Sequence, residues 1–173
     1  MFVGDSITHS GMWSEFFPDI SVANRGVTGD TTADVKARLS TIFATNPEYA
    51  FIMLGLNDIY KYVSAERIVS NYADIVEALQ QNNIQVVIQS TIQCLQVYCE
   101  DLVGEVNRLN ELLKYYAGNN GVTFLNLNEL SSIDGLDESL TSDGIHLNAK
   151  GYRVWVDILS SKINKLSSDA FDG

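Results

Sequence analysis

The sequence predicts an α/β fold in which helices cover both faces of a parallel β-sheet. Residues 49–54 are continuously apolar, which is how a strand that is buried on both faces reads, and residues 84–90 are predicted to form another buried strand. They alternate with longer stretches whose apolar residues recur at the spacing of amphipathic helices. This alternation is typical of parallel strands that are joined by right-handed crossovers.

The domain organisation follows from the length and composition. The chain has 173 residues and contains no linker, repeat or low-complexity segment. A chain of this length can bury a substantial core by itself. We therefore expect a single domain over residues 1–166, followed by a frayed tail at residues 167–173.

The first part of the chain is expected to form two strands with a short helix between them. Phe2 and Val3 end the first strand, and Ile20 and Val22 mark the second. The helix covers residues 12–17, where apolar and aromatic residues gather on one side.

A further helix is expected to begin after Thr31. Thr31 and Asp34 have the spacing of a capping box, with aspartate in place of the usual glutamate. The apolar residues behind them form one helical face: Val35, Leu39, Ile42 and Phe43. Asn46-Pro47 ends this helix, because the residue before a proline disfavours helical backbone.

The middle of the chain reads as strand, helix, strand and helix. After the strand at residues 49–54, Ser64 caps a helix with the apolar face Ile68, Tyr72, Ile75 and Leu79. A second helix is expected from Asp101, after the strand at residues 84–90 and a loop. Its apolar face is Leu102, Val106, Leu109, Leu113 and Tyr116.

The last part is expected to supply one strand, a long loop and one helix. Gly118 or Gly121 ends the preceding helix, and residues 122–127 form the fifth strand. A long loop then carries Asp143-Gly144-Ile145-His146. Asn148 opens the last helix, which faces the core through Tyr152, Trp155, Leu159 and Ile163.

The charge balance limits the partners that this chain can have. Twenty-two acidic against eleven basic side chains give a net charge of −11. Such a field repels phosphate backbones and anionic membrane surfaces, so we expect no nucleic-acid partner. No apolar run approaches the roughly 20 residues of a membrane-spanning helix, and the oligomeric state stays open.

The beginning of the chain leaves the location open. Only Phe2 and Val3 precede Gly4, whereas a typical strand has about five or six residues. We therefore expect residues upstream of Met1 in the natural protein. No secretory signal is present in the sequence as given, so the location is the cytoplasm, or outside it if an upstream signal has been removed.

Cys94 and Cys99 lie five positions apart in a predicted loop. This spacing is not the Cys-x-x-Cys pattern of metal and redox sites. We expect two unlinked thiols, with a small disulfide as the alternative.

Polar residues with catalytic potential follow the predicted strands. Ser6 follows the first strand, Gly29 lies in the loop after the second, and Asn57 follows the third. The carboxyl ends of parallel strands meet at one edge of the sheet, where ligands bind. We therefore expect these three residues to lie together.

The chain has two histidines, His9 and His146, and only His146 has an obvious carboxylate partner, Asp143, three positions away. A serine hydroxyl becomes nucleophilic when a neutral imidazole accepts its proton, and a carboxylate orients that imidazole. One turn can present both Asp143 and His146. We expect Ser6 to act as nucleophile with this pair, and His9 to lie at the rim.

The negative charge that develops on an attacked carbonyl needs hydrogen-bond donors, each worth about 3–4 kcal/mol. The available donors are the backbone N–H groups of Ser6 and Gly29 and the side-chain amide of Asn57. Glycine at position 29 allows close approach of the backbone and a positive φ.

Taken together, four blocks of this sequence resemble the SGNH hydrolases, also called the GDSL lipase/esterase family. They are Gly4-Asp5-Ser6, the Gly26–Asp30 loop, Gly55-Leu56-Asn57-Asp58 and Asp143-Gly144-Ile145-His146. Each block alone is weak evidence, whereas their order along nearly the whole chain is specific. The resemblance implies a flavodoxin-like three-layer α/β/α sandwich with a five-stranded parallel sheet of order 2-1-3-4-5. It also implies the roles given above to Ser6, Gly29, Asn57, Asp143 and His146.

The resemblance further implies a carboxylic ester hydrolase that forms an acyl-enzyme and needs no cofactor or metal. Gly29-Asp30-Thr31 and Leu147-Asn148 look like the family members that cleave small acyl esters. We therefore expect a small-molecule ester substrate with a short, acetyl-type acyl group, carried by a carbohydrate. The main alternative is a lysophospholipase or thioesterase acting on longer chains. Leu147 departs from the proline of many members, a change that we expect to be harmless.

Other kinds of function are also open. A non-catalytic carbohydrate-binding module would share the fold, but the intact serine, histidine and aspartate favour an enzyme. A cation site at Asp5, Asp143 and His146 would have few ligands. A flavin-binding electron carrier would share the topology, although the loop over residues 4–11 lacks the expected phosphate-binding pattern.

Five further residues have two readings each. Asp5 and Asp58 could brace loops or take part in the chemistry, and we expect them to brace loops. Tyr60, Tyr62 and Tyr98 follow strands at the catalytic edge, where they could line an acyl or sugar pocket or simply pack.

Overall fold

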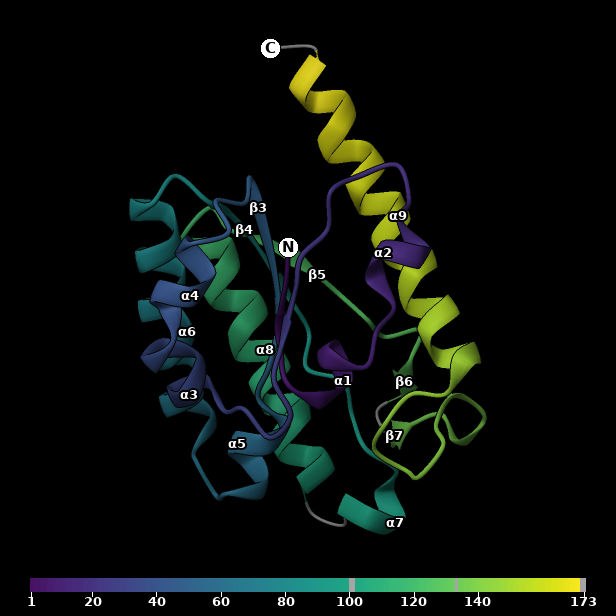
Figure 1. Ribbon diagram of the computed structural model, residues 1–173. Helices are drawn as coiled ribbons and strands as arrows, with labels where there is room; N and C mark the ends of the chain where they lie inside the picture. Colours follow the sequence, from purple (N-terminus) through teal and green to yellow (C-terminus); the bar gives the residue numbers. More distant parts are fainter. Residues whose placement is uncertain (100–101, 133, 172–173) are drawn as a thin grey trace.

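A five-stranded parallel sheet forms the centre of the structure, a computed structural model that describes residues 1–99, 102–132 and 134–171 (Figure 1). The strand order is β2-β1-β3-β4-β5, as predicted. The strands are β1 (Phe2–Gly4), β2 (Asn24–Gly26), β3 (Tyr49–Met53), β4 (Gln85–Gln89) and β5 (Thr123–Leu125). A separate antiparallel pair, β6 (Ser131–Ser132) and β7 (Gly135–Leu136), lies beside the carboxyl edge of this sheet.

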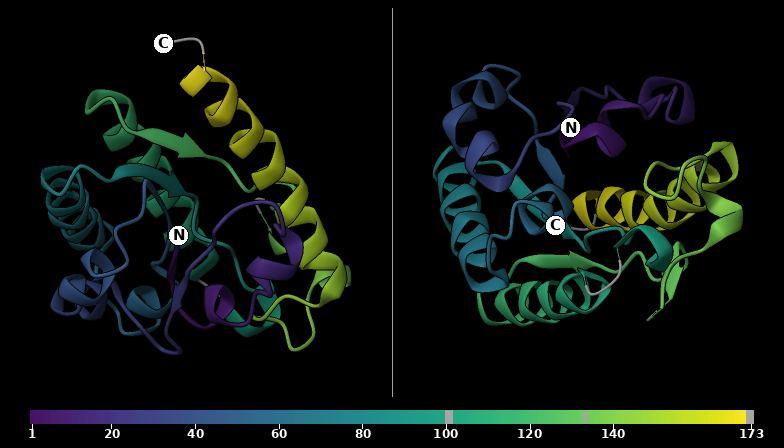
Figure 2. Two further views of the ribbon diagram at one scale, coloured as in Figure 1. Left: turned by 45° about the horizontal axis from the view of Figure 1, so that its top comes forward. Right: turned by 90° about the horizontal axis from the view of Figure 1, so that it is seen from below.

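Helices cover both faces of the sheet, so the predicted three-layer sandwich is confirmed (Figures 1 and 2). One layer contains α3 (Thr32–Ala37), α4 (Leu39–Phe43), α6 (Ala65–Gln81) and α8 (Leu102–Asn119), which pack side by side. The other contains α2 (Trp13–Phe16) and α9 (Ala149–Phe171), whose aromatic rings meet. Three short helices lie at the carboxyl edge: α1 (Ser6–His9), α5 (Leu56–Tyr60) and α7 (Gln96–Cys99).

The predicted helix starts are stabilised by side-chain caps. The Thr31 hydroxyl accepts a hydrogen bond from the backbone N–H of Asp34 and the Asp34 carboxylate accepts one from Thr31, which completes the capping box. Ser64 Oγ accepts from the N–H of Arg67 at the start of α6. Asn148 Oδ1 accepts from two N–H groups at the start of α9. These bonds satisfy donors that a helix start leaves without an intrahelical partner.

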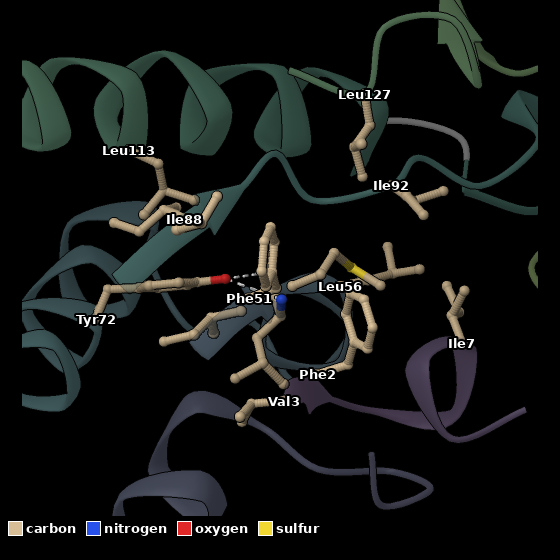
Figure 3. Packing of buried hydrophobic residues seen from close by; sticks show 14 of the residues in the cluster. Phe2, Val3, Ile7, Phe51, Leu56, Tyr72, Ile88, Ile92, Leu113 and Leu127 are labelled. Carbon is tan, nitrogen blue, oxygen red and sulfur yellow. Dashed lines mark hydrogen bonds between the residues drawn. The ribbon is translucent and has the colours of Figure 1, made fainter. Parts of the chain in front are cut away.

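The core forms where the apolar helix faces meet the sheet (Figure 3). Every residue of the predicted α6 face is buried, as are three residues each of the predicted α8 and α9 faces: Ile68, Tyr72, Ile75, Leu79, Val106, Leu109, Leu113, Tyr152, Trp155 and Leu159. The fully buried Tyr72 hydroxyl donates to the carbonyl of Leu54 and accepts from its N–H. This side chain therefore fixes the chain at the carboxyl end of β3.

The second strand lies later in the chain than its apolar residues predicted. The prediction at Ile20 and Val22 is wrong: β2 is Asn24–Gly26, and Ile20 is 44% exposed. Asn24 pairs with Phe2 of β1, and its side chain donates to three backbone carbonyls in the segment from Thr8 to Gly11. Side-chain hydrogen bonds thus hold this edge strand in place of apolar burial.

The helix predicted after Thr31 is divided at Arg38 into α3 and α4. The Arg38 guanidinium donates to the carboxylate of Asp30 at 2.6 Å and to the carbonyl of Arg25 at 2.8 Å. These contacts tie the break between the two helices to the loop that contains Gly29.

The C-terminal part of the chain is helical over a longer stretch than the sequence pattern indicated. Helix α9 reaches Phe171 and so overlaps the tail predicted at residues 167–173, of which the last two lie outside the described residues. Fraying of this segment stays a prediction. None of the helices in the described parts of the chain has the length and apolar character needed to cross a membrane.

Candidate active site

Ser6 follows the carboxyl end of β1, which lies between β2 and β3 in the sheet, and is the first residue of α1. Asp5 precedes it and caps the helix, because Asp5 Oδ1 accepts a hydrogen bond from the N–H of Ile7 at 3.0 Å. The turn is tight: a Cβ at Gly4 would overlap Thr8 Oγ1 and would lie 2.6 Å from the carbonyl oxygen of Met53. Glycine at position 4 is therefore required by close packing.

The structure brings Ser6 and His146 together. Ser6 Oγ lies 3.0 Å from His146 Nε2, and His146 Nδ1 lies 2.7 Å from Asp143 Oδ2. An ionised carboxylate can only accept hydrogen bonds, so Nδ1 carries the proton and donates it to Asp143. In a neutral imidazole Nε2 is then an acceptor, directed at the Ser6 hydroxyl.

Asp143 also fixes the backbone of the turn Asp143–His146, which we call the acid–base turn. Its Oδ1 accepts from the N–H of Ile145 at 3.0 Å and from the N–H of His146 at 2.7 Å. The hydrogen bond from the His146 backbone is the main reason why the pKa of Asp143 is lowered to about 2. The carboxylate is therefore charged throughout the neutral pH range, and the 52% exposure of its side chain also favours the charged form.

Asn57 lies in the first turn of α5 and faces the loop that follows β2. Asn57 Nδ2 donates to the carbonyl of Asp30 at 3.0 Å and lies 3.5 Å from Asp5 Oδ2. Gly29 precedes Asp30 and has a φ of +83°, a backbone conformation that glycine adopts without strain. Asn57 and the Gly29 loop are thus neighbours at the edge that carries Ser6.

Asp58 holds these two segments together. Its carboxylate accepts from the N–H of Thr32 at 3.0 Å and from the Thr32 hydroxyl at 2.5 Å. Asp58 is 1% exposed, and burial raises its pKa. The prediction that Asp58 braces a loop is confirmed.

Asp5 is a second buried carboxyl beside the serine. It is 2% exposed, and burial raises its pKa from 3.8 to about 6, against the opposing effects of the Ile7 hydrogen bond and of His146. Asp5 therefore changes its charge just below neutral pH, next to Ser6.

His9 contacts the carboxyl end of β2, whereas His146 contacts Ser6. Its Nδ1 lies 3.2 Å from the carbonyl of Gly26, and the residue is exposed. The expected rim position is confirmed.

The two cysteines form a disulfide, so the expectation of two unlinked thiols is wrong. Cys94 and Cys99 are bonded across a Cα–Cα distance of 6.1 Å, and both residues are buried. The bond closes the segment from Cys94 to Cys99, which we call the disulfide loop. This loop contacts the acid–base turn, a relationship that the sequence analysis missed because no residue spacing encodes it.

The three tyrosines near this edge differ in their surroundings. Tyr98, in the disulfide loop, lies against Gly144 of the acid–base turn. The Tyr60 hydroxyl lies 3.2 Å from Cys99 Sγ, and burial, together with the charge of Asp143, raises its pKa. Tyr62 is 90% exposed.

A cation site is not supported by the arrangement of the side chains. Within the described residues, no group of three histidine, cysteine, aspartate or glutamate side chains is placed to hold a metal ion. Asp5, Asp143 and His146, considered above as alternative ligands, therefore do not form such a group.

Comparison with known families gives one match over most of the chain. The model of the GDSL-like lipase/acylhydrolase family matches residues 2–154. Among solved structures, a Bacteroides fragilis protein provisionally described as an acylhydrolase superposes with a TM-score of 0.86. It is 26% identical, and the match covers 95% of this chain and 86% of that protein.

Two groups of curated proteins are also similar. N-acylneuraminate cytidylyltransferases of Streptococcus agalactiae strains are 28% identical over 75% of this chain, and the chain spans only 33% of their length. An acetylxylan esterase of Geobacillus stearothermophilus is 29% identical over 35% of this chain and 40% of its own length.

Proposed function

Because this chain belongs to the GDSL-like lipase/acylhydrolase family, we propose that it is a carboxylic ester hydrolase with Ser6 as nucleophile. The observation that carries this proposal is the hydrogen-bonded series Ser6–His146–Asp143, with distances of 3.0 and 2.7 Å. In this series the hydroxyl faces the unprotonated nitrogen of an imidazole, and a charged carboxylate holds the other nitrogen.

The acylation step uses His146 first as a base and then as an acid. Ser6 Oγ attacks the ester carbonyl while His146 Nε2 takes the hydroxyl proton, and the negative charge of Asp143 stabilises the resulting imidazolium. The tetrahedral intermediate collapses when the imidazolium gives its proton to the leaving alcohol. An acyl group then remains on Ser6, and attack by water on this acyl-enzyme, with His146 again as base, releases the acid.

The oxyanion of the tetrahedral intermediate is bound by donors from three strand ends. These are the N–H groups of Ser6 and Gly29 and the side-chain amide of Asn57. The contact of Asn57 with the carbonyl of Asp30, at 3.0 Å, supports this assignment because it places the amide beside the Gly29 turn. An amide nitrogen carries two hydrogens, so one can hold the loop while the other exchanges its long 3.5 Å contact with Asp5 Oδ2 for the oxyanion.

The substrate class is a short acyl ester, an acetyl ester in particular, on a carbohydrate alcohol. The similarity to an acetylxylan esterase supports this assignment. The exposure of the catalytic pair supports it as well, since the side chains of His146 and Asp143 are 39% and 52% exposed. An exposed general acid can reach the leaving oxygen of a bulky, hydrated alcohol. The runner-up substrates are longer acyl esters and thioesters.

The proposal is tested by hydrolysis of p-nitrophenyl acetate by the wild type, Ser6→Ala and His146→Ala, with His9→Ala as the matched histidine control. We expect both active-site variants to lose several powers of ten in kcat, as in other serine hydrolases, and the control to keep its activity. Equal rates in all four proteins would overturn the assignment and favour a carbohydrate-binding module.

The acyl preference is tested separately with nitrophenyl esters of increasing chain length and with acetylated xylo-oligosaccharides. The proposal predicts the highest kcat/KM for acetyl esters and release of acetate from the oligosaccharide. A maximum with acyl chains of about eight carbons would instead favour a lysophospholipase or thioesterase.

A further inference from the structure

The disulfide loop Cys94–Cys99 lies directly against the acid–base turn Asp143–His146. The backbone N–H of Leu95 donates to the carbonyl of Gly144 at 2.7 Å. Gly144 lies between Asp143 and His146 in the chain, so this bond reaches the middle of the turn. Its short length makes it a firm link between two segments that lie about 50 positions apart in the sequence.

The ring of Tyr98 makes a second contact from the same loop. A Cβ at Gly144 would overlap the Cδ2 and Cε2 atoms of Tyr98 and would lie 3.3 Å from Cγ, so the ring packs directly on the glycine backbone. Gly144 also has a φ of +90°, which disfavours other residues. Residue 144 is thus held between the N–H of Leu95 and an aromatic ring.

The disulfide loop is itself anchored to the body of the protein. The carbonyl of Cys94 accepts from the N–H of Leu136 at 3.1 Å, and Leu95 forms an antiparallel bridge with Gly135 of β7. At the other end of the loop, Cys99 Sγ lies 3.2 Å from the hydroxyl of Tyr60, which belongs to the same short helix as Asn57. The loop therefore connects the helix of Asn57 with the acid–base turn.

Within the acid–base turn Gly144 is buried, Ile145 and His146 are half-buried and Asp143 is exposed, so burial holds this turn only in part. Bonds within the loop set its shape: the Thr141 hydroxyl and the Ser142 N–H both donate to the carbonyl of His146. These bonds do not by themselves place the turn relative to Ser6. The contacts of Leu95 and Tyr98 bind it to a loop whose own conformations are restricted by a covalent bond.

We propose that the disulfide loop is the positioning element for the Asp143–His146 pair, so that full hydrolytic activity requires the Cys94–Cys99 bond. This inference rests on the proposed function of Ser6, His146 and Asp143. A small displacement of the imidazole is enough to matter, since a misplacement of about 1 Å can lower a rate about 100-fold.

A dithiol reductant can break the disulfide, so the dependence of activity on this bond can be tested. Two successive thiol–disulfide exchanges transfer two electrons and two protons to the Cys94–Cys99 bond and convert the dithiol to its own disulfide. The products in the protein are two thiols. Because both cysteines are buried, exchange requires local opening of the loop.

The first test compares oxidised wild type, wild type reduced with dithiothreitol, and Cys94→Ser/Cys99→Ser, with the thiols counted by mass spectrometry after alkylation of an unfolded sample. We expect kcat for p-nitrophenyl acetate to fall about 10- to 100-fold in the two forms without the disulfide, with a smaller change in KM. Reoxidation should restore kcat in the wild type only. The inference is wrong if kcat of the fully reduced wild type stays within about twofold of kcat of the oxidised form, because that change is much smaller than the expected loss.

The second test addresses the ring contact. Tyr98→Ala should lower kcat while Tyr98→Phe preserves it, because ring carbons and not the hydroxyl lie nearest to Gly144. Tyr115→Ala is the matched control, since Tyr115 is a 72% exposed tyrosine on α8. Equal kcat in Tyr98→Ala and the control would exclude a positioning role for the ring.

A third measurement separates this inference from the proposed function, because it needs no turnover. The proton on His146 Nδ1 should give a downfield NMR signal while it is bonded to Asp143, and His146→Gln identifies that signal by removing it. Ser6 Oγ lies 3.0 Å from His146 Nε2, so the oxidised wild type and oxidised Ser6→Ala should show this signal at different chemical shifts. We expect reduction to remove that difference. An inactive wild type would overturn the proposed function alone, whereas a difference that is unchanged after reduction would overturn the positioning role.

Discussion

Ser6 Oγ and His146 Nε2 lie 3.0 Å apart although 140 positions separate the two residues in the chain. The contact depends on β1, an interior strand of the sheet, and on the loop before α9, because these elements carry the two side chains. Local geometry supplies the remaining partner, since Asp143 lies in the same turn as His146. The site thus combines one long-range relationship with one short-range relationship.

The short-range relationship predicts the effect of Asp143→Asn. An asparagine amide can donate a hydrogen bond to His146 Nδ1, which favours the tautomer that carries its proton on Nε2. In that tautomer Nε2 cannot accept the proton of Ser6. We expect kcat for p-nitrophenyl acetate to fall about 10⁴-fold. Asp157→Asn, an exposed aspartate on α9, is the control and should behave as the wild type. If kcat of Asp143→Asn falls less than about tenfold, the role of Asp143 is contradicted, because removal of such a carboxylate lowers kcat much more.

Asn57→Ala tests the oxyanion assignment. Removing one preorganised donor should lower kcat about 10²- to 10³-fold with little change in KM, because the donor acts on charge that develops only in the transition state. Asn119→Ala, at the far end of α8, is the matched control. A thermal melt must accompany the kinetics, since Asn57 also donates to the carbonyl of Asp30. Unchanged kcat in a folded Asn57→Ala protein would remove Asn57 from the oxyanion hole.

The pH dependence of kcat/KM should show a single protonation on its acid side. The pKa of Asp143 is lowered to about 2, so this carboxylate stays charged wherever the protein is active. The proposed attack by Ser6 needs His146 Nε2 as an acceptor. The pKa of Asp5 is raised to about 6, so Asp5 is the one rival group beside Ser6. The acid limb should persist in Asp5→Asn, and its disappearance there would assign the limb to Asp5.

Asp5 should also make the stability depend on pH. Folding raises the pKa of Asp5 from 3.8 to about 6, so the native state favours the protonated carboxyl. The resulting stabilisation is present in full below about pH 4 and is lost as the pH rises through about 6. The size of the effect is about 3 kcal/mol, at 1.36 kcal/mol for each pKa unit.

This effect can be isolated with Asp5→Asn, which keeps an acceptor for the N–H of Ile7 and does not ionise. Urea unfolding of both proteins from pH 3 to pH 8 should show the variant gaining stability relative to the wild type between about pH 4 and pH 6. A difference that is constant over this range would show that Asp5 does not titrate in this way.

The sequence predicted the fold well where burial controls the structure. The spacing of Ile68, Tyr72, Ile75 and Leu79 identified the buried face of α6, and the apolar stretches identified β3 and β4. It failed for β2, because Asn24 is held by hydrogen bonds to backbone carbonyls and not by an apolar face. The three carbonyls that accept from Asn24 lie at the end of α1 and just after it. No local pattern in the sequence specifies where α1 ends.

The candidate site was predictable for a related reason. Ser6, Gly29 and Asn57 follow successive strands, and the geometry of a parallel sheet places strand ends together whatever the loops do. The disulfide was not predictable from the spacing of the cysteines. It depends on a Cα–Cα distance of 6.1 Å, which is set by the backbone conformation of Leu95 and α7. The support of the acid–base turn by Tyr98 likewise exists only in three dimensions.

The aromatic contact between α2 and α9 provides an optical probe of folding. Trp13 and Trp155 are the two tryptophans of the chain, and their rings meet edge to face with centroids 4.9 Å apart. The same junction contains the bond from the Tyr152 hydroxyl to the carbonyl of Ile7, at 2.6 Å. Contacts so distant in sequence form slowly compared with helices. Tryptophan emission during stopped-flow refolding should therefore follow, without any label, the step that joins the segment bearing the serine to the segment bearing the histidine.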